Sequence, residues 1–282
     1  MASSLNKGIQ VANVPTRVAT RLAEGLKRFQ PVLTSARSRD LGESDTVTII
    51  VDILADVFGF DKYSEITSEH AIRGTYCDLA IKVDNALLTM VEAKAIGLDL
   101  SDAHVKQAVD YAANQGVDWV ILTNGICWRV YKVTFAKPID KELVLEFDLL
   151  TMSHRSEKDL DCLYLISREG WTKSALGEFH VQKQALSRFF LGAMILSDPV
   201  LQVIRRELRR VSPDVKIDTE EIRAVLTAEV LKRDVLEGDK ADDARKKLSR
   251  AANRALREKA TKANDEATAV PPPENIAASP EA

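Results

Sequence analysis

Cysteine and histidine are scarce in this sequence of 282 residues, which contains three cysteines and four histidines. Cys77, Cys127 and Cys162 are odd in number, and no two of them form a CxxC pair. This usage argues against a disulfide framework and against a Cys/His zinc site. A reducing compartment fits these cysteines best, so we expect a cytoplasmic protein.

Long apolar runs and nucleotide-binding loops are also missing. Nowhere do about 18 apolar residues follow one another, and the amino-terminal segment lacks the apolar centre of a signal peptide. We therefore expect a soluble protein with no membrane partner. Neither GxxxxGK[ST] nor GxGxxG occurs, so the sequence contains no recognisable motif for ATP hydrolysis or dinucleotide binding.

Neither sign of charge dominates. There are 39 basic and 42 acidic residues, which gives a net charge of −3, and 45% of the residues are hydrophobic. These values are typical of a globular protein with a sizeable core. They exclude a protein that is basic overall and coats nucleic acid, but they are compatible with a local basic patch.

Hydrophobic periodicity predicts two helices near the start of the chain, at residues 14–36 and 42–58. Further along, it predicts a helix at 102–114 between six strand-like segments at 66–72, 76–83, 87–95, 119–123, 127–133 and 143–147. Helices framing several strands, some of them joined by hairpins, predict an α/β fold with a mixed sheet flanked by helices.

After residue 153 no convincing strand remains, and we expect helices only, including a buried one at 182–196. Asp218 lies three residues before Glu221, a spacing typical of a capping box. The expected organisation is an N-terminal extension (1–14), an α/β domain (15–152), a mainly helical C-terminal domain (153–263) and a disordered tail (264–282).

Charged residues interrupt two of the apolar strands. Asp78 begins one of them, and Glu92 and Lys94 lie in the next. If residues 84–86 form a three-residue loop, Asp78 lies directly opposite Glu92, with Cβ atoms ~4.5–5.5 Å apart, and Lys94 points the same way. A two-residue loop would instead place Cys77 opposite Glu92, so the pairing depends on register.

Two bare carboxylates at that distance repel each other unless a cation lies between them. Lys94 supplies one compensating positive charge, and a divalent metal ion is the natural source of the rest. Oxygen ligands without a suitable cysteine or histidine set indicate Mg²⁺ or Mn²⁺. The alternative to a metal site is a set of exposed ion pairs on an ordinary hairpin.

An acid followed by acid-x-lysine is the core pattern of the PD-(D/E)XK nuclease superfamily, with Cys77 where its usual proline precedes the first acid. Glu43 heads the second predicted helix, and Gln107 and Tyr111 lie four residues apart on the next. With Thr123-Asn124-Gly125 and Trp128-Arg129-Val130-Tyr131 downstream, this ordered series resembles the N-terminal nuclease domain of the R subunit of type I restriction enzymes. The resemblance covers roughly residues 15–150.

The resemblance implies a restriction-endonuclease-like fold and a metal held by Asp78, Glu92 and the Ala93 carbonyl. It implies that Lys94 orients the attacking water and stabilises the developing negative charge. Glu43 would be a further metal or water ligand. Gln107 and Tyr111 would support the site and the nucleic-acid phosphates. The alternative for Glu43 is an acid in the first turn that interacts favourably with the helix dipole. The alternative for Gln107 and Tyr111 is an ordinary polar helix face.

The expected reaction is therefore Mg²⁺-dependent hydrolysis of phosphodiester bonds, with DNA as the expected substrate and endonucleolytic cleavage as the expected mode. R subunits continue into an ATP-driven translocase, whereas we expect no motor here. The expected partners are nucleic acid and separate restriction-system subunits or a second copy of the chain. The alternative is a nuclease-fold module that binds nucleic acid or a partner without cleaving.

Two basic runs in the C-terminal half are candidate phosphate contacts. They comprise eight residues: Arg205, Arg206, Arg209, Arg210, Arg245, Lys246, Lys247 and Arg250. The alternative is a solvated helix face. No helix-turn-helix or zinc-finger signature accompanies them, so they predict contact with the backbone and no reading of bases.

Overall fold

The structure, a computed structural model, describes residues 14–72, 75–135, 138–214 and 216–268. The chain divides into two compact units, Met1–Gln182 and Lys183–Ala282. We describe each unit by itself.

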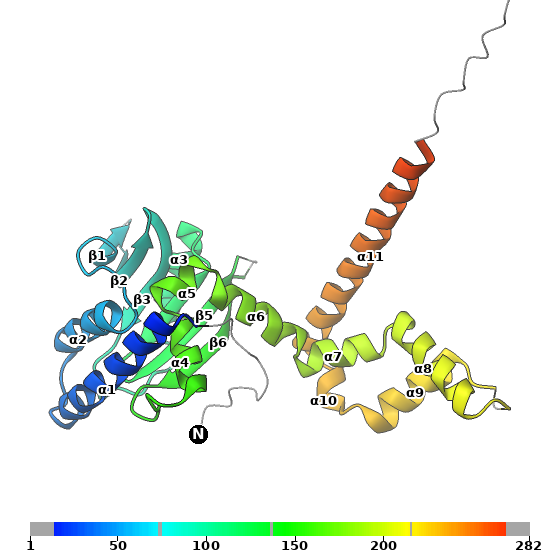
Figure 1. The fold of residues 1–282 in the computed structure, drawn as a ribbon, viewed down its shortest axis with the longest axis horizontal. Coiled ribbons are helices and arrows are strands. Elements are labelled where there is room, and N and C mark those ends of the chain that lie inside the picture. The colour runs from blue at the N-terminus through cyan, green and yellow to red at the C-terminus, as the bar shows by residue number, and fades with distance from the viewer. Residues whose placement is uncertain (1–13, 73–74, 136–137, 215, 269–282) are drawn as a thin grey trace, which may run out of the picture. The chain divides into compact units, whose positions relative to one another are not determined.

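A six-stranded mixed sheet forms the centre of the first unit (Figure 1). Its strands lie in chain order: β1 (Ile66–Ile72), β2 (Thr75–Val83), β3 (Ala86–Ala93), β4 (Trp119–Thr123), β5 (Cys127–Thr134) and β6 (Asp140–Asp148). Only β3 and β4 pair in parallel, and the other neighbours are antiparallel. The predicted mixed sheet is thereby confirmed.

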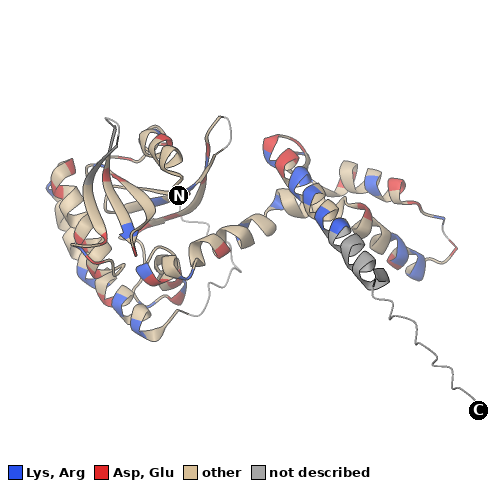
Figure 2. Cartoon of the chain, turned by 90° about the horizontal axis from the view of Figure 1, so that it is seen from above, with Lys and Arg blue, Asp and Glu red and all other residues tan. Residues whose placement is uncertain are grey.

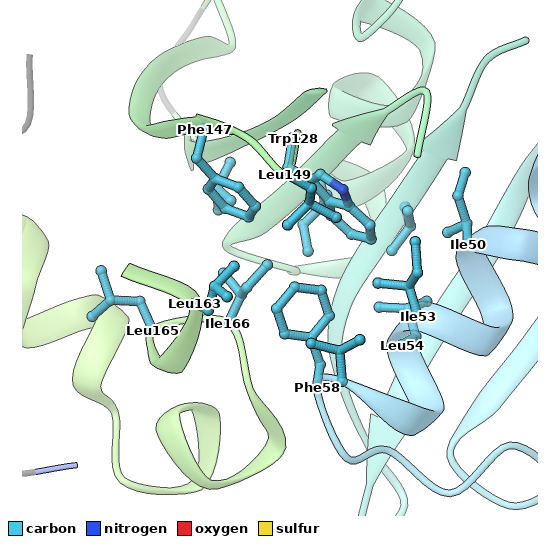
Figure 3. Packing of buried hydrophobic residues seen from close by; sticks show 14 of the residues in the cluster. Ile50, Ile53, Leu54, Phe58, Trp128, Phe147, Leu149, Leu163, Leu165 and Ile166 are labelled. Carbon is cyan, nitrogen blue, oxygen red and sulfur yellow. The ribbon is translucent and has the colours of Figure 1, made fainter. Parts of the chain in front are cut away.

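Helices cover both faces of this sheet. α1 (Thr16–Ser38) and α2 (Glu43–Asp56) bury their apolar residues in the larger core cluster, which Figure 3 shows around Phe58 and Trp128. α3 (Lys106–Gln115) buries its apolar residues in a smaller cluster. Strand β3 serves both clusters, since Val91 belongs to the larger and Met90 to the smaller, as the alternation of a strand requires.

The first unit continues beyond the sheet through α4 (Glu157–Tyr164), α5 (Arg168–Thr172) and the start of α6 (Ala175–Ala185). Leu163, Leu165 and Ile166 pack in the same core cluster as Phe58 and Trp128 (Figure 3). The unit therefore ends at residue 182, whereas the change in sequence texture had placed the domain boundary at residue 152. The apolar residues of this segment are buried by the sheet unit, and composition alone does not reveal that.

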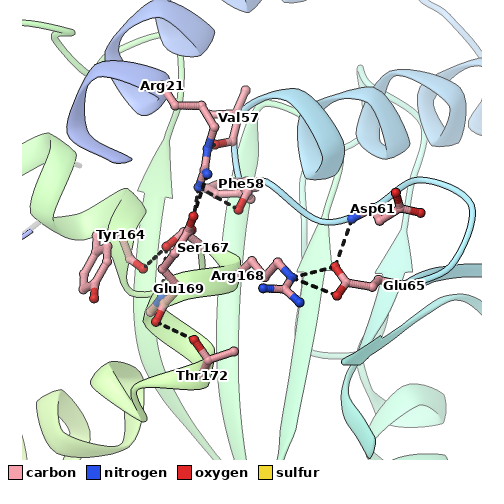
Figure 4. Close-up of polar contacts among 11 residues, drawn as sticks. Arg21, Val57, Phe58, Asp61, Glu65, Tyr164, Ser167, Arg168, Glu169 and Thr172 are labelled. Carbon is pink, nitrogen blue, oxygen red and sulfur yellow. Dashed lines mark hydrogen bonds and ion pairs between the residues drawn. The ribbon is translucent and has the colours of Figure 1, made fainter. Parts of the chain in front are cut away.

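Ion pairs add to this packing (Figure 4). The Arg21 guanidinium donates to both carboxylate oxygens of Glu169 at 2.7 Å and to the Phe58 carbonyl at 3.2 Å. Nε of Arg168 donates to the Glu65 carboxylate at 2.8 Å, and that carboxylate also accepts from the Asp61 amide. Both pairs join α5 to segments more than a hundred residues earlier in the chain.

The second unit contains only helices in its described residues, as predicted. They are α7 (Arg188–Ile195), α8 (Asp198–Val211), α9 (Thr219–Val225), a π-helical turn η1 (Leu226–Val230), α10 (Arg233–Leu236) and α11 (Asp239–Thr268). The capping box before α9 is confirmed: Asp218 accepts from the Glu221 amide at 2.8 Å, and Glu221 accepts from the Asp218 amide at 3.0 Å.

The single buried helix predicted over 182–196 is wrong. The helix breaks at Ser187, whose hydroxyl accepts from the Phe190 amide and so caps a new helix, α7. Leu186 and Leu191 remain exposed, because this unit buries few apolar side chains. At its far end, α11 runs to Thr268, past the predicted boundary at 263. Residues 1–13 of the predicted extension (1–14) and residues 269–282 of the predicted tail (264–282) lie outside the described residues.

Among the residues that the structure describes, no helix is both long enough and apolar enough to cross a membrane.

The Arg21–Glu169 pair predicts a pH-dependent contribution to stability. The hydrogen bonds from Arg21 lower the pKa of Glu169 below its ordinary value of 4.5. The contribution is therefore present above pH 4.5 and is lost as the pH falls through the lower pKa of the folded state. At pH 7 we expect Glu169→Gln to lower the free energy of unfolding by about 0.5–1 kcal/mol, since the pair is partly exposed.

Urea unfolding of the wild type and the variant between pH 7 and pH 3 measures this difference. The difference should shrink toward zero below pH 4.5. Glu178→Gln, which changes an exposed carboxylate of α6, is the matched control and should have little effect at either pH. A difference for Glu169→Gln that does not depend on pH would contradict the assignment.

Candidate functional site

The β2–β3 hairpin brings the predicted acids together, but not through the predicted loop. Val83 pairs with Ala86, so the loop contains two residues, Asp84 and Asn85. Both have positive φ angles, 49° and 64°, which is typical of a type I′ turn. The three-residue loop predicted over 84–86 is therefore wrong.

A β-bulge restores the register that the shorter loop would have lost. The pairing shifts between Ile81 and Lys82, after which Ile81 pairs with Thr89 and Leu79 with Val91. One step further in this register, Asp78 faces Glu92. Asp78 Oδ2 also accepts a hydrogen bond from the Ala93 amide at 2.7 Å. Asp78 and Glu92 therefore lie together as predicted, but because of a β-bulge that the sequence did not indicate.

The ammonium group of Lys94 lies at the centre of this cluster. Its Nζ atom is 2.7 Å from Glu92 Oε1 and 2.8 Å from the Ala93 carbonyl oxygen. Glu43 Oε2, from the first turn of α2, is 3.5 Å away, and Asp78 Oδ2 is 3.9 Å away. Three carboxylates from three elements therefore share one cation. We call Glu43, Asp78, Glu92 and Lys94 the Lys94 cluster.

Burial and charge act against each other in the Lys94 cluster. The Glu92 side chain is only 10% exposed, and this burial raises its pKa, assisted by the negative charges of Asp78 and Glu43 and opposed by the hydrogen bond from Lys94. Burial also disfavours the charged form of Lys94. Its hydrogen bond to Glu92 and the three carboxylate charges outweigh that effect and raise the pKa of Lys94. The cluster therefore carries one positive charge for up to three negative ones.

Two polar side chains that were not predicted as site residues fix the segment that follows Lys94. Thr46 is fully buried, and its hydroxyl accepts from the Ile96 amide at 3.1 Å and donates to the Gly42 carbonyl at 2.8 Å. Asn124 donates to the Leu98 carbonyl at 2.9 Å. Thr46 lies one helical turn after Glu43, so α2 both supplies an acid and anchors the lysine's loop.

Gln107 and Tyr111 lie on α3, as predicted, with Gln107 exposed and Tyr111 buried. Burial raises the pKa of Tyr111. Both residues line a cavity of about 350 Å³, together with Ala103, Lys106, Asp110 and Asn114. No member of the Lys94 cluster lines this cavity. The cavity therefore does not connect Gln107 and Tyr111 to the cluster.

The donor atoms of the Lys94 cluster suit a hard divalent cation. Among the described residues, no three Asp, Glu, His or Cys side chains are arranged to hold a metal by themselves. However, Mg²⁺ takes one or two carboxylates and keeps several waters. Asp78, Glu92 and the Ala93 carbonyl offer such a set. An ion there would take over contacts that the Lys94 ammonium makes in this structure.

The eight basic residues predicted to contact phosphates differ in their surroundings. Arg205 donates to the Ile217 carbonyl, and Arg245 donates to the Leu236 carbonyl and pairs with Asp242. Glu207 pairs with two further members, and Gln184 accepts from another; these are Arg206, Arg210 and Lys247. The remaining three are exposed: Arg209, Lys246 and Arg250.

Taken together, the first unit is a mixed α/β domain with an acid–lysine cluster at the carboxyl end of a central strand. Residues 49–143 match the family described as Type I restriction enzyme R protein N terminus (HSDR_N). Over these residues the match confirms the resemblance seen in the sequence. The matched segment includes Asp78, Glu92 and Lys94 and begins after Glu43. The comparisons with curated proteins and with solved structures give no match.

The role of Thr46 predicts a specific loss of stability. Thr46→Val keeps the shape of the side chain but leaves the buried Ile96 amide without its acceptor. We expect the free energy of unfolding to fall by about 1–3 kcal/mol, with an unchanged denaturant slope. Urea unfolding measures both quantities.

Thr46→Ser keeps the hydroxyl and is the control. It should retain most of the lost stability, since it removes only a methyl group. If Thr46→Ser destabilises the protein as much as Thr46→Val, packing of the methyl group matters and the hydrogen bond does not.

Proposed function

We propose that this protein is a divalent-metal-dependent nuclease that hydrolyses phosphodiester bonds in DNA, with endonucleolytic cleavage, at the Lys94 cluster. The observation that carries the proposal is the convergence of three carboxylates and a backbone carbonyl on one lysine ammonium. The family match over residues 49–143 is compatible with a nuclease and supports DNA as the substrate.

In the proposed mechanism, Asp78, Glu92 and the Ala93 carbonyl hold the metal. Mg²⁺ or Mn²⁺ held there would supply polarisation of the scissile phosphate and a lower pKa for a bound water molecule. Glu92 is held by burial in a fixed orientation, and Asp78 is held by its hydrogen bond to the Ala93 amide. Both carboxylates are therefore preorganised to bind an ion.

Lys94 has two tasks in this proposal. Its ammonium, which contacts the Ala93 carbonyl in this structure, would orient the attacking water. It then stabilises the negative charge that develops on the phosphorus oxygens. Glu43, half exposed at the start of α2, lies 3.5 Å from the same ammonium and is proposed as a further metal or water ligand. Gln107 and Tyr111 on α3 are proposed to support the phosphates of the substrate.

The second candidate function is a module that binds DNA or a partner without cleaving it. The observation that favours it is that the Lys94 ammonium already pairs with the acids in this structure, an arrangement that needs no metal to hold the cluster together. Other restriction-system subunits are proposed partners in either case, on the strength of the family match.

Cleavage of supercoiled circular DNA tests the proposal. We expect nicking or linearisation with Mg²⁺ or Mn²⁺ and none with EDTA. Lys94→Ala should lower the rate about 100-fold or more, because it removes the charge that stabilises the transition state. Asp78→Asn should have a similar effect through loss of a metal ligand, and thermal unfolding verifies that both variants fold.

Lys173→Ala, which removes an exposed lysine of the same unit, is the matched control and should cleave like the wild type. Cleavage that survives Lys94→Ala would mean that another site or a contaminant cuts the DNA. If the wild type binds DNA but does not cleave it under any of these conditions, the binding module is the better account.

A further inference from the structure

We propose that one face of α11 is a binding surface for the phosphate backbone of duplex DNA. The face consists of Lys246, Arg250, Arg254 and Arg257, which we call the α11 basic face. The inference rests on the proposed function, because DNA is the substrate there. It assigns a second DNA contact, in the unit that does not contain the Lys94 cluster.

The spacing of these residues places them on one side of the helix. They follow one another at intervals of four, four and three positions, which keeps them within a single stripe. All four side chains are exposed. From Lys246 to Arg257 the helix rises about 17 Å. One strand of a duplex presents about five phosphates over that length.

The opposite side of α11 faces its own unit. Ala241 and Ala244 are buried, Leu248 is partly buried, and α11 contacts α7. Leu248 is two positions from Lys246, which on a helix separates their directions by about 200°. The contacts within the unit therefore leave the basic face turned outward. Figure 2 shows the blue Lys and Arg segments succeeding one another along this helix.

Charge in this helix is concentrated in one stretch. Residues 245–257 contain six basic residues and no acidic one, whereas the preceding turn contains Asp239, Asp242 and Asp243. Arg245 is paired with Asp242 and donates to the Leu236 carbonyl, so it belongs to the start of the helix and not to the basic face.

The charges of the two units differ in sign. Residues 1–182 contain 20 basic and 25 acidic residues, a net charge of −5, and residues 183–282 contain 19 basic and 17 acidic residues, a net charge of +2. An acidic unit with a cluster of carboxylates repels a polyanion at long range. A nuclease of this composition needs a positive surface elsewhere in the chain, and the α11 basic face is an exposed surface of that kind.

The chemistry favours a nucleic-acid backbone over the other anionic partners. Arginine and lysine in a straight row match a regular array of phosphates, and three of the four residues are arginines, which bind phosphate oxygens in pairs. The exposed side of the helix carries no apolar stripe among its described side chains between 245 and 254, as insertion into a lipid surface would require. The face is therefore expected to bind any duplex sequence.

The test is the salt dependence of DNA binding by the full chain in EDTA, which prevents cleavage. The probe is a fluorescent duplex of about 30 base pairs, titrated between about 50 and 200 mM salt. Lys246→Gln with Arg250→Gln removes two charges of the basic face. We expect the slope of log K against log salt to fall in magnitude by about 2, and the affinity at low salt to fall about 10- to 100-fold.

The matched control is Lys216→Gln with Lys232→Gln, which removes two exposed lysines of the same unit that lie outside α11. The control should keep the wild-type slope. Equal loss in both double variants, or no loss in the basic-face variant, would overturn the proposal. Wild-type protein that binds vesicles of anionic lipid but not the duplex would overturn it as well.

The proposal and the nuclease assignment fail separately. Binding is measured in EDTA, so its salt dependence is read without any cleavage at the Lys94 cluster. A wild type that binds DNA with the expected slope but never cleaves it contradicts the nuclease assignment alone. A wild type that cleaves but whose binding does not depend on the basic face contradicts this inference alone.

Discussion

One ammonium group holds together the charged cluster of the first unit. Lys94 lies within 4 Å of three carboxylates and a backbone carbonyl, and Glu92 among these is nearly buried. Carboxylates held so close together stay charged only if a cation shares the space with them. In the described structure that cation is the lysine. The proposal is that a divalent ion shares this space as well, and binding of that ion would make the charge cluster a catalytic site.

Three features of the fold position this lysine. The β-bulge at Ile81 and Lys82 sets the register of β2 against β3, and Thr46 on α2 holds the backbone after Lys94 through the Ile96 amide. Asn124, at the turn between β4 and β5, holds the same segment further along. The acids and the lysine thus come from segments spread over fifty residues of sequence. Their common position depends on hydrogen bonds and not on the sheet alone.

The mixed sheet, the three helices that cover it and the acids of the proposed site could be predicted from the sequence, because alternation, helical spacing and charges within apolar strands are local signals. The bulge could not: it compensates a two-residue loop, and nothing near Lys82 signals an extra residue. Thr46 was missed for a similar reason, since a threonine on an apolar helix face gives no indication of its distant partner. The boundary of the first unit was also misplaced, because burial of Leu163 and Ile166 depends on a surface formed a hundred residues earlier.

The account as a whole depends on whether the Lys94 cluster binds a divalent ion. The most direct measurement is the anomalous diffraction of Mn²⁺ in crystals of the full chain. The account predicts a peak about 2.1–2.2 Å from oxygens of Asp78, Glu92 and the Ala93 carbonyl, with Lys94 Nζ moved away from that carbonyl. No peak at saturating Mn²⁺, or a peak only at other residues, would contradict it.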